Sequence, residues 1–243
     1  MAPELLPKID SALALLQRVA IEYRPAAFAN SLGAEDMVLT DMISRHRVGI
    51  DMFTLDTGRL HEDTLNLLPR IADRYKREVH VVRPDAAAVA GYVRQYGRDA
   101  FYNSVELRKG CCHIRKVEPL QRALAGRKAW ITGLRRAQSS ARTGVAVQEF
   151  DEAHGLAKFN PLADWTEGDV WDYLRGHEVP YNPLHDQGYP SIGCAPCTRS
   201  VSPGEDPRAG RWWWEQEAAS ECGLHFAPDG RLVRAKTGEK VVQ

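Results

Sequence analysis

The sequence predicts an α/β protein, built on a single doubly wound, mostly parallel sheet with helices on both faces. Short apolar runs of strand length alternate along the chain with segments of helical hydrophobic periodicity. Such alternation requires crossover connections, and these bring successive strands parallel in one covered sheet. The length of 243 residues, with 44% hydrophobic and 26% charged residues, suits one domain with a sizeable core.

The first third of the chain contains three predicted strands with helices before and between them. Apolar residues from Leu5 to Val19 recur at helical spacing. Pro25 introduces a short apolar run of strand type, and a third run, Glu78–Arg83, is rich in β-branched residues. The predicted elements are a helix over 3–20, a strand over 26–29, a helix after 34, a strand over 49–55, a helix over 61–75 and a strand over 78–83.

The later part of the chain adds an Ala-rich helix over about 85–96 and a fourth strand over 128–132. Thr166 and Asp169 have the spacing of a capping box, which predicts a helix that begins there. Residues 226–243 are short, polar and turn-rich, and we expect them to form a flexible C-terminal tail. Residues 1–225 are then predicted to form one α/β domain.

Charge and hydropathy exclude several classes of protein. The chain has 32 Lys and Arg residues and 32 Asp and Glu residues, so it has no overall attraction to nucleic acid or anionic membrane. Its apolar stretches, such as Ala86–Ala90, are too short to cross a bilayer. Glu4 interrupts any pattern of a secretory signal. We expect a cytoplasmic protein with no membrane and no nucleic-acid partner.

One segment is nevertheless strongly basic. Residues 108–142 hold ten Lys or Arg residues and a single acid, Glu118. A solvated basic face would explain this run. A small anionic substrate or cofactor held nearby would explain it equally well. Double-stranded nucleic acid is less favoured, because the run has no recognition motif.

Three turns after predicted strands are the first candidates for a binding site, because ligands of such sheets bind at the carboxyl ends of strands. They span 31–36, 55–59 and 133–139. The first places Ser31 and Gly33 before a helix, where free N–H groups can hold phosphate, although short Ser/Gly turns often only connect elements. It has neither the P-loop lysine nor a dinucleotide-binding glycine pattern. The third has Arg135 and Arg136, which suit an oxyanion or form a surface pair.

The five cysteines are the most informative residues. Cys194 and Cys197 form a C-x-x-C pair, which serves zinc sites, iron–sulfur clusters and redox dithiols. Cys111 and Cys112 are adjacent, an awkward arrangement for tetrahedral zinc. Four thiolates match the requirement of an iron–sulfur cluster, and basic neighbours would offset its negative charge. Zinc and reactive dithiols remain alternatives, and structural disulfides are the less expected use in a cytosolic protein.

The fifth cysteine, Cys222, lies near the C-terminus, outside the predicted α/β core. It is either an incidental thiol or a nucleophile on a mobile segment that reaches an electrophile bound in the core. Gly223 permits a sharp turn there, and His225 could pair with the substrate or with the thiolate.

Together these segments resemble the assimilatory adenylyl-sulfate (APS) reductases. The resemblance runs in order over about residues 20–226 and is most specific in the two cysteine pairs and the last motif. The segments that carry it are SLGAEDMVL at 31–39, LDTGRL at 55–60, CCHIRKVEPL at 111–120, ITGLRRAQS at 131–139, GCAPCTR at 193–199 and ECGLH at 221–225. These reductases belong with the phosphoadenylyl-sulfate (PAPS) reductases to the adenine-nucleotide α-hydrolase-like group.

The resemblance implies reduction of APS to sulfite and AMP, with thioredoxin or a glutaredoxin-like protein as electron donor. It implies Cys222 as the nucleophile, which forms a thiosulfonate, within a domain that includes the cluster loops and the ECGLH segment. It also implies a 4Fe–4S cluster on Cys111, Cys112, Cys194 and Cys197. The implied substrate-binding residues are Ser31, Gly33, Leu55, Thr57, Gly58, Lys116, Arg136, Arg208, Arg211 and His225.

Three alternatives remain open at this point. A PAPS or dual-specificity reductase would differ only in basic contacts near the ribose 3′ position. A nucleotide-activating enzyme of the same fold would carry S-G-G-x-D-S where residues 31–36 read S-L-G-A-E-D. A non-catalytic zinc-binding module would use the same cysteines. The resemblance also leaves open whether the protein forms a homo-oligomer.

Overall fold

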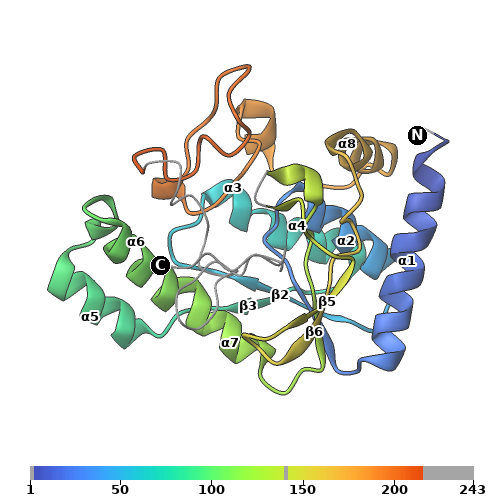
Figure 1. Cartoon of the computed structure of the whole chain (residues 1–243), viewed down its shortest axis with the longest axis horizontal. Coiled ribbons are helices and arrows are strands. Elements are labelled where there is room, and N and C mark those ends of the chain that lie inside the picture. Colours follow the sequence, from blue (N-terminus) through green and yellow to red (C-terminus); the bar gives the residue numbers. More distant parts are fainter. Residues whose placement is uncertain (1–2, 140–141, 216–243) are drawn as a thin grey trace, which may run out of the picture.

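A computed structural model of the chain describes residues 3–139 and 142–215. One six-stranded sheet crosses its centre in the order β3-β2-β1-β4-β6-β5 (Figure 1). All neighbouring strands are parallel except the edge strand β5, which pairs antiparallel with β6. The strands are β1 (Ala26–Ala29), β2 (Asp51–Leu55), β3 (His80–Val82), β4 (Ala129–Ile131), β5 (Gln148–Asp151) and β6 (Leu156–Phe159). The predicted fold class is confirmed.

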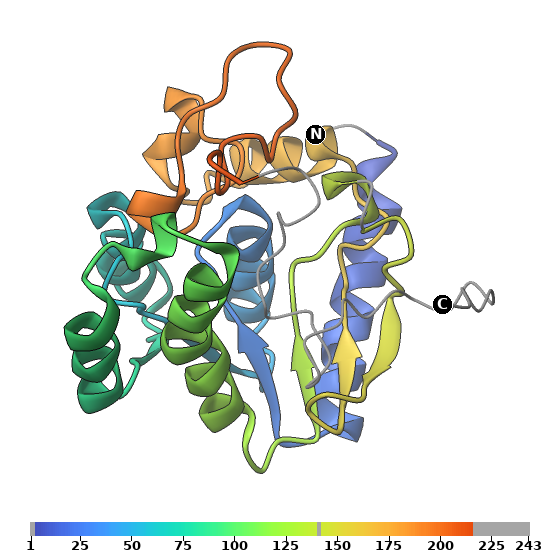
Figure 2. The same cartoon turned by 60° about the vertical axis from the view of Figure 1, so that its left-hand side comes forward.

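Helices flank the sheet on both sides (Figures 1 and 2). They are α1 (Leu5–Glu22), α2 (Ala34–Arg45), α3 (Glu62–Leu65), α4 (Leu67–Tyr75), α5 (Ala86–Tyr96), α6 (Val105–Cys112), α7 (Glu118–Leu124) and α8 (Glu167–Gly176). No helix of the described ranges has the length and apolar character that crossing a membrane would require.

The two faces of the sheet belong to two separate cores, because successive residues of a strand point to opposite faces. Phe28 of β1 packs in the larger core, with apolar residues of α1, α2, α4 and α8. The neighbouring Ala27 packs in the smaller core, with Leu120 of α7 and Trp130 of β4. This division fixes the sheet between its helices and leaves the carboxyl ends of the strands to the connecting loops.

Most predicted elements are present, with shifts of a few residues at their ends. The capping box of α8 is confirmed, since the Thr166 hydroxyl accepts from the Asp169 N–H and the Asp169 carboxylate accepts from the Thr166 N–H. Asp85 caps α5 by accepting from the Ala88 N–H. The single helix predicted over 61–75 is wrong in one respect, because the chain there forms two helices that meet at Asn66.

Several elements were not predicted. The β5–β6 hairpin has a polar edge strand, with the sequence QEFD, that lacks a clear apolar alternation. Helix α6 reads VELRKGCC and has no apolar stripe of helical period. It continues into one π-helical turn, His113–Val117, and then into α7. Local hydrogen bonds mark both segments, since Ser104 caps α6 and the Asp151 side chain accepts from N–H groups of the hairpin turn. The predicted boundary at residue 225 and the predicted tail lie outside the described residues.

Candidate active site

The candidate site lies at the carboxyl ends of β1, β2 and β4, where three loops meet the chain that follows α8. The segment that follows α8, coloured orange to red, lies beyond the strand ends in the same region as α3 (Figure 1). In the rotated view of Figure 2, the orange segment lies next to the green end of α6. Residues far apart in the sequence therefore share one edge of the sheet, as the topology predicts.

The turn after β1 is held by its own side chains. The Ser31 N–H and hydroxyl both donate to one carboxylate oxygen of Asp36, at 2.6 and 2.5 Å. Leu32 adopts a left-handed backbone (φ +64°), and its N–H donates to the Asn30 side chain at 2.8 Å. Gly33 then begins α2 as its N-cap residue. The turn thus presents a helix N-terminus at the strand end, the place where phosphate binds in other proteins.

Asp36 connects this turn to the loop after β4. Its side chain is buried, and it also accepts a hydrogen bond from the backbone of Gly133. A Cβ at position 133 would lie 2.2 Å from the Asp36 carboxylate, so only glycine fits there. Burial raises the pKa of Asp36 to about 6, against the lowering effect of the Ser31 and Gly133 hydrogen bonds. One buried carboxyl group therefore fixes two of the three loops.

The loop after β2 faces the cysteines. The Thr57 hydroxyl lies 3.2 Å from the Cys194 sulfur, and Thr57 is almost fully buried. The Arg115 guanidinium donates to the Thr57 carbonyl at 2.7 Å. Gly58 follows in a left-handed conformation (φ +69°) that favours glycine. The predicted phosphate ligand Thr57 is thus engaged with a thiol in this structure.

The loop after β4 separates its two arginines. Arg135 is buried and forms an ion pair with Glu35 at 2.8 Å. Arg136 is partly exposed and forms an ion pair with Asp164, and it also donates to the Val145 carbonyl at 2.7 Å. Arg135 is therefore a structural residue. Arg136, which was predicted to bind an oxyanion, is paired in this structure with the carboxylate of Asp164.

The four cysteines of the described residues lie beyond the strand ends and are free thiols. Cys111 at the end of α6 packs with Cys194 and Cys197 in a small apolar cluster that also holds Phe101 and Trp212. The loop of the C-x-x-C pair is joined to the loop after β2, because the Ala195 N–H donates to the Arg59 carbonyl at 2.7 Å and Leu60 forms a β-bridge with Cys194. Cys112 is buried next to Cys111.

Burial sets the protonation of Cys111 and Cys197. It raises the pKa of Cys197 to about 12, and the neighbouring Cys194 adds to the effect, while Lys116 and Arg211 oppose it. It also raises the pKa of Cys111, against the lowering influence of the Arg115 guanidinium. Without a further positive centre these sulfurs stay protonated at neutral pH. The cations nevertheless lie where thiolates would need them.

The described cysteines are not gathered around a single point. In residues 3–139 and 142–215, no three His, Cys, Asp or Glu side chains come close enough to hold one metal ion. Tetrahedral zinc requires four ligands at about 2.0 to 2.3 Å from one centre. The observed cysteine arrangement is more open than that.

Two basic residues lie near the C-x-x-C pair. Lys116 lies in the π-helical turn that follows the cysteine pair of α6, and its charge acts on Cys197. π-helical turns often occur at functional sites. The Arg211 side chain is buried, and its guanidinium packs so closely on Gly193 that a Cβ there would lie 2.3 Å away. Its Nη1 donates weakly to the Ser191 hydroxyl at 3.3 Å.

Of the other predicted site residues, two are described and two lie outside the described residues. Leu55 ends β2, so its backbone lies at the strand end as predicted. Arg208 is partly exposed in a turn where its N–H donates to the Asp206 side chain at 2.7 Å. Cys222 and His225 lie outside the described residues.

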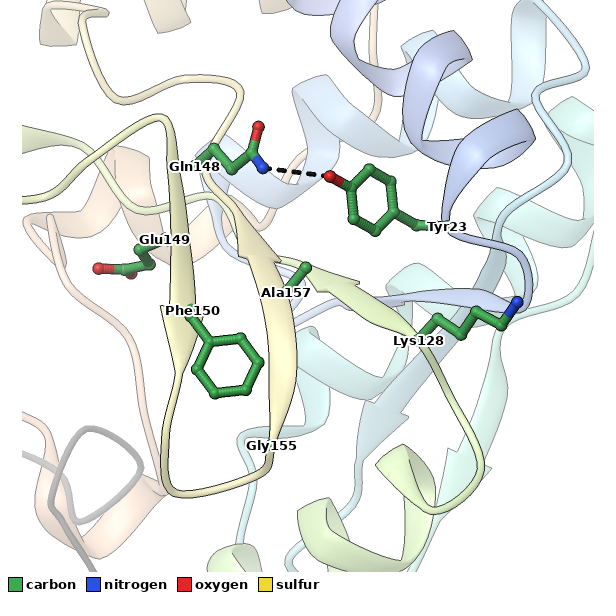
Figure 3. Close-up of a pocket in the computed structure, with 7 residues that line it drawn as sticks. All are labelled: Tyr23, Lys128, Gln148, Glu149, Phe150, Gly155 and Ala157. Carbon is green, nitrogen blue, oxygen red and sulfur yellow. Dashed lines mark hydrogen bonds between the residues drawn. The ribbon is translucent and has the colours of Figure 1, made fainter.

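Figure 3 shows a surface pocket whose lining contains none of the residues of this site. It is lined by residues of the β5–β6 hairpin and by the end of α1, where the Gln148 side chain donates to the Tyr23 hydroxyl at 3.2 Å. The residues that line it are Tyr23, Lys128, Gln148, Glu149, Phe150, Gly155 and Ala157. None of the predicted site residues is among them, so this pocket is not the candidate site.

Comparison with known proteins identifies the family. The family model of the phosphoadenosine phosphosulfate reductase domain matches residues 25–200. This range includes the three strand-end loops and both cysteine pairs. The chain belongs to this family.

Curated members of the family are similar over nearly their whole length. The adenosine 5′-phosphosulfate reductase of Burkholderia cepacia is 56% identical over 226 residues, which cover 93% of this chain and 90% of that protein. The adenosine 5′-phosphosulfate reductase of Allochromatium vinosum is 54% identical and covers 94% of this chain and 91% of its own length. That of Neisseria meningitidis serogroup A is 52% identical, over 91% of each chain.

Solved structures agree with the fold. The phosphoadenylyl-sulfate (PAPS) reductase of Candida auris, in a phosphate complex, has a TM-score of 0.67 and 27% identity, and covers 83% of this chain and 98% of its own. The FMN adenylyltransferase of Candida glabrata has a TM-score of 0.57 at 14% identity, covering 90% of this chain and 77% of its own, which shows a shared fold alone.

Three residues of this phosphoadenosine phosphosulfate reductase domain were not predicted as parts of the site. Asp36 and Glu35 fasten the loops, and Arg115 joins the cysteine-bearing turn to Thr57. The position of two acids in the first turn of a helix, directly after a Ser/Gly turn, was a usable signal for the first pair. Arg115 was expected only as a basic neighbour of the cysteines, and its contact with Thr57 depends on the π-helical turn.

Asp36 makes a pH-dependent contribution to stability that a substitution can isolate. Its pKa of about 6 lies above its ordinary value of 3.8, so the folded protein binds this proton more tightly than the unfolded chain. The free energy of unfolding therefore falls as the pH rises from about 4 to 6. Between pH 5 and 7.5 the wild type should lose about 1 kcal/mol more than Asp36→Asn, as measured by urea unfolding. Parallel losses in the two proteins would contradict the assignment.

Proposed function

We propose that this chain reduces adenosine 5′-phosphosulfate (APS) to sulfite and AMP in sulfate assimilation. The activity is that of an oxidoreductase acting on a sulfur group. The observation that carries the proposal is the 52–56% identity with curated adenosine 5′-phosphosulfate reductases over more than nine-tenths of this chain. We assign it to the cytoplasm, where thiol-based donors keep cysteines reduced.

Cys111, Cys112, Cys194 and Cys197 would hold a 4Fe–4S cluster. The donor set fits this group, since four free thiols from two segments lie at one edge of the sheet. Four cysteine thiolates are the usual ligands of such a cluster, and these two segments could supply all four. Bound here, the cluster would supply a fixed charge distribution and would join α6 to the C-x-x-C loop.

The substrate would lie between the strand-end loops and the basic residues near the cysteines. Ser31 and Gly33, at the N-terminus of α2, would hold the phosphate, and the backbone at Leu55 would hold the adenine. Thr57 and Gly58 would line the space between phosphate and cysteines. The Ser31 hydroxyl now donates to Asp36, so it would have to rotate before it could donate to a phosphate oxygen.

Positive charge near the sulfate would come from four basic residues and one histidine. An anionic nucleophile that approaches an anionic sulfate requires such compensation, and buried cations provide it most effectively. Arg211 is buried beside Gly193, and both Lys116 and Arg211 act on Cys197. The full proposed set is Lys116, Arg136, Arg208, Arg211 and His225. For Arg136, binding would require exchange of its present partner, Asp164.

The reaction would proceed through a covalent intermediate on Cys222. The Cys222 thiolate attacks the sulfur of APS, the bond from that sulfur to the bridging oxygen breaks, and AMP leaves. The enzyme then carries a thiosulfonate. A thiolate of thioredoxin, or of a glutaredoxin-like protein, attacks the Cys222 sulfur, and sulfite leaves with the electron pair of the S–S bond. The second donor thiol resolves the mixed disulfide, so that a dithiol is oxidised and Cys222 is regenerated.

A PAPS or dual-specificity reductase is the second candidate. The description of the matching family domain and the Candida auris structure both name the phosphoadenosine form of the substrate. The two substrates differ by one phosphate at the ribose 3′ position, which would need additional basic contacts. Curated relatives above 50% identity carry the APS name, so APS is the preferred proposal.

The first prediction from the proposed function concerns the metal. Protein purified without oxygen should be brown and should contain about four irons per chain. Serine at any one of Cys111, Cys112, Cys194 or Cys197 should remove the colour and most activity, because an incomplete site exposes iron to solvent. Cys222→Ser is the matched control and should keep its iron. Stoichiometric zinc without iron would reject the cluster and favour the zinc-binding module.

The second prediction concerns the substrate. Parallel anaerobic assays should give a kcat/KM for APS at least tenfold above that for PAPS. A tenfold preference corresponds to about 1.4 kcal/mol, roughly the worth of one charge-assisted hydrogen bond. Equal or better use of PAPS would assign the chain to the dual-specificity or PAPS class.

The third prediction concerns the nucleophile. Serine at position 222 keeps the approximate shape, but its hydroxyl is un-ionised at neutral pH. Cys222→Ser should bind APS and lose sulfite production. In the wild type, APS without donor should add a sulfonate to the peptide that contains Cys222, visible by mass spectrometry, and thioredoxin should release it as sulfite. Near wild-type turnover by the variant, or a sulfonate on another cysteine, would rule out this mechanism.

A further inference from the structure

The segment 210–215 lies between the two parts of the chain that carry the cysteine pairs. On one side it is hydrogen-bonded to the C-x-x-C loop. The Trp212 N–H donates to the Cys197 carbonyl at 3.2 Å, and the Arg199 N–H donates to the Gly210 carbonyl at 2.9 Å. This backbone pairing places the segment directly beside the loop (Figure 1, red).

On its other side the segment is joined to α6 by a buried ion pair. Arg108 of α6 donates to both carboxylate oxygens of Glu215, from Nε and Nη2, at 2.8 Å each. The two side chains are only 0% and 3% exposed. Arg108 lies one helical turn before Cys111 on the same helix. The ion pair therefore links the helix of the first cysteine pair to the end of the segment.

Trp212 fills the space between these contacts. Its ring is buried, and the guanidiniums of Arg108 and Arg211 lie over it at 4.7 and 4.6 Å from the ring centroid. Its backbone is left-handed (φ +47°), a conformation that a bulky residue adopts only when its surroundings hold it there. The segment is thus fixed in one sharp path.

A buried ion pair contributes little net free energy to stability. Removing two charges from water costs much of what their attraction returns, and apolar residues of similar volume often stabilise a protein equally well. What a two-bonded arginine–carboxylate pair adds is a defined orientation. Glu215 is seven residues before Cys222 in the sequence. A fully extended chain covers at most about 25 Å over that distance, so the position of Glu215 limits where Cys222 can reach.

We infer that Arg108 and Glu215 are positioning residues. Their ion pair holds the residue from which the chain continues to Cys222 in a fixed position relative to α6, the helix that carries Cys111 and Cys112. The inference rests on the proposed function, in which Cys222 attacks the substrate. Its content is separate from that proposal, because Cys222 could act as nucleophile without any dependence on this ion pair.

The decisive variant is Glu215→Gln, which keeps the shape and removes the charge. Iron content and visible absorption should match the wild type. At saturating APS and without donor, the rate at which the Cys222 peptide gains a sulfonate should fall at least tenfold, as followed by quenched-flow mass spectrometry. A wild-type rate, or a loss of iron, would overturn the inference.

Two further variants separate positioning from stability. Asp41→Asn removes a charge of α2 that is equally buried, with Tyr75, Tyr173 and the exposed Arg45 as its partners. It should lower the unfolding midpoint and leave the sulfonation rate near that of the wild type. The double variant R108M/E215M leaves no uncompensated charge, so its unfolding midpoint should rise above that of Glu215→Gln. Its sulfonation rate should remain low.

The outcomes distinguish this inference from the function beneath it. If the wild type never gains a sulfonate on Cys222, the proposed mechanism fails, and this inference fails with it. If the wild type reacts and R108M/E215M recovers both stability and rate, only the positioning role is wrong.

Discussion

The carboxyl group of Asp36 is the contact on which the strand-end loops depend. It accepts from the Ser31 backbone and hydroxyl within the first loop, and from the Gly133 backbone in the loop after β4. Parallel strands bring their carboxyl ends to one edge, but nothing in the sheet itself fixes the loops that follow. A buried acceptor with several donors provides that constraint, and the missing side chain at position 133 leaves room for it. The cost is a carboxyl group whose pKa rises to about 6.

Around this frame the charges are arranged in separate groups. Arg135 is occupied by Glu35 inside the frame, whereas Lys116 and Arg211 act on the sulfur of Cys197. The apparent basic run from residue 108 to 142 is therefore not one surface. Part of it is structural, as in the buried Arg108, and part lies near the sulfurs. A count of charges along the sequence cannot make this distinction, because it depends on which side of a helix each residue occupies.

Much of the fold and part of the site followed from the sequence. The apolar run at 26–29, the β-branched run near 80 and the capping box at Thr166 each have a local cause, and each formed as predicted. Helix α6 and the β5–β6 hairpin have weaker local causes, the Ser104 cap and the Asp151 turn, and neither element has a clear apolar pattern. The cysteine pairs could be recognised by spacing, whereas the contact of Thr57 with Cys194 could not, because it joins residues 137 positions apart.

That separation also bears on how the molecule assembles. Arg108 and Glu215 are 107 residues apart, and the strand β1 at the centre of the sheet pairs with β4 about a hundred residues later. Contacts of this range close long loops. The chain loses the entropy of loop closure before the contacts can stabilise the fold. The sheet can form from residues up to about 160, but the edge that carries the cysteines needs the final described segment. A nascent chain would therefore hold Cys111 without its partners Cys194, Cys197 and Trp212 while the following hundred residues are being synthesised.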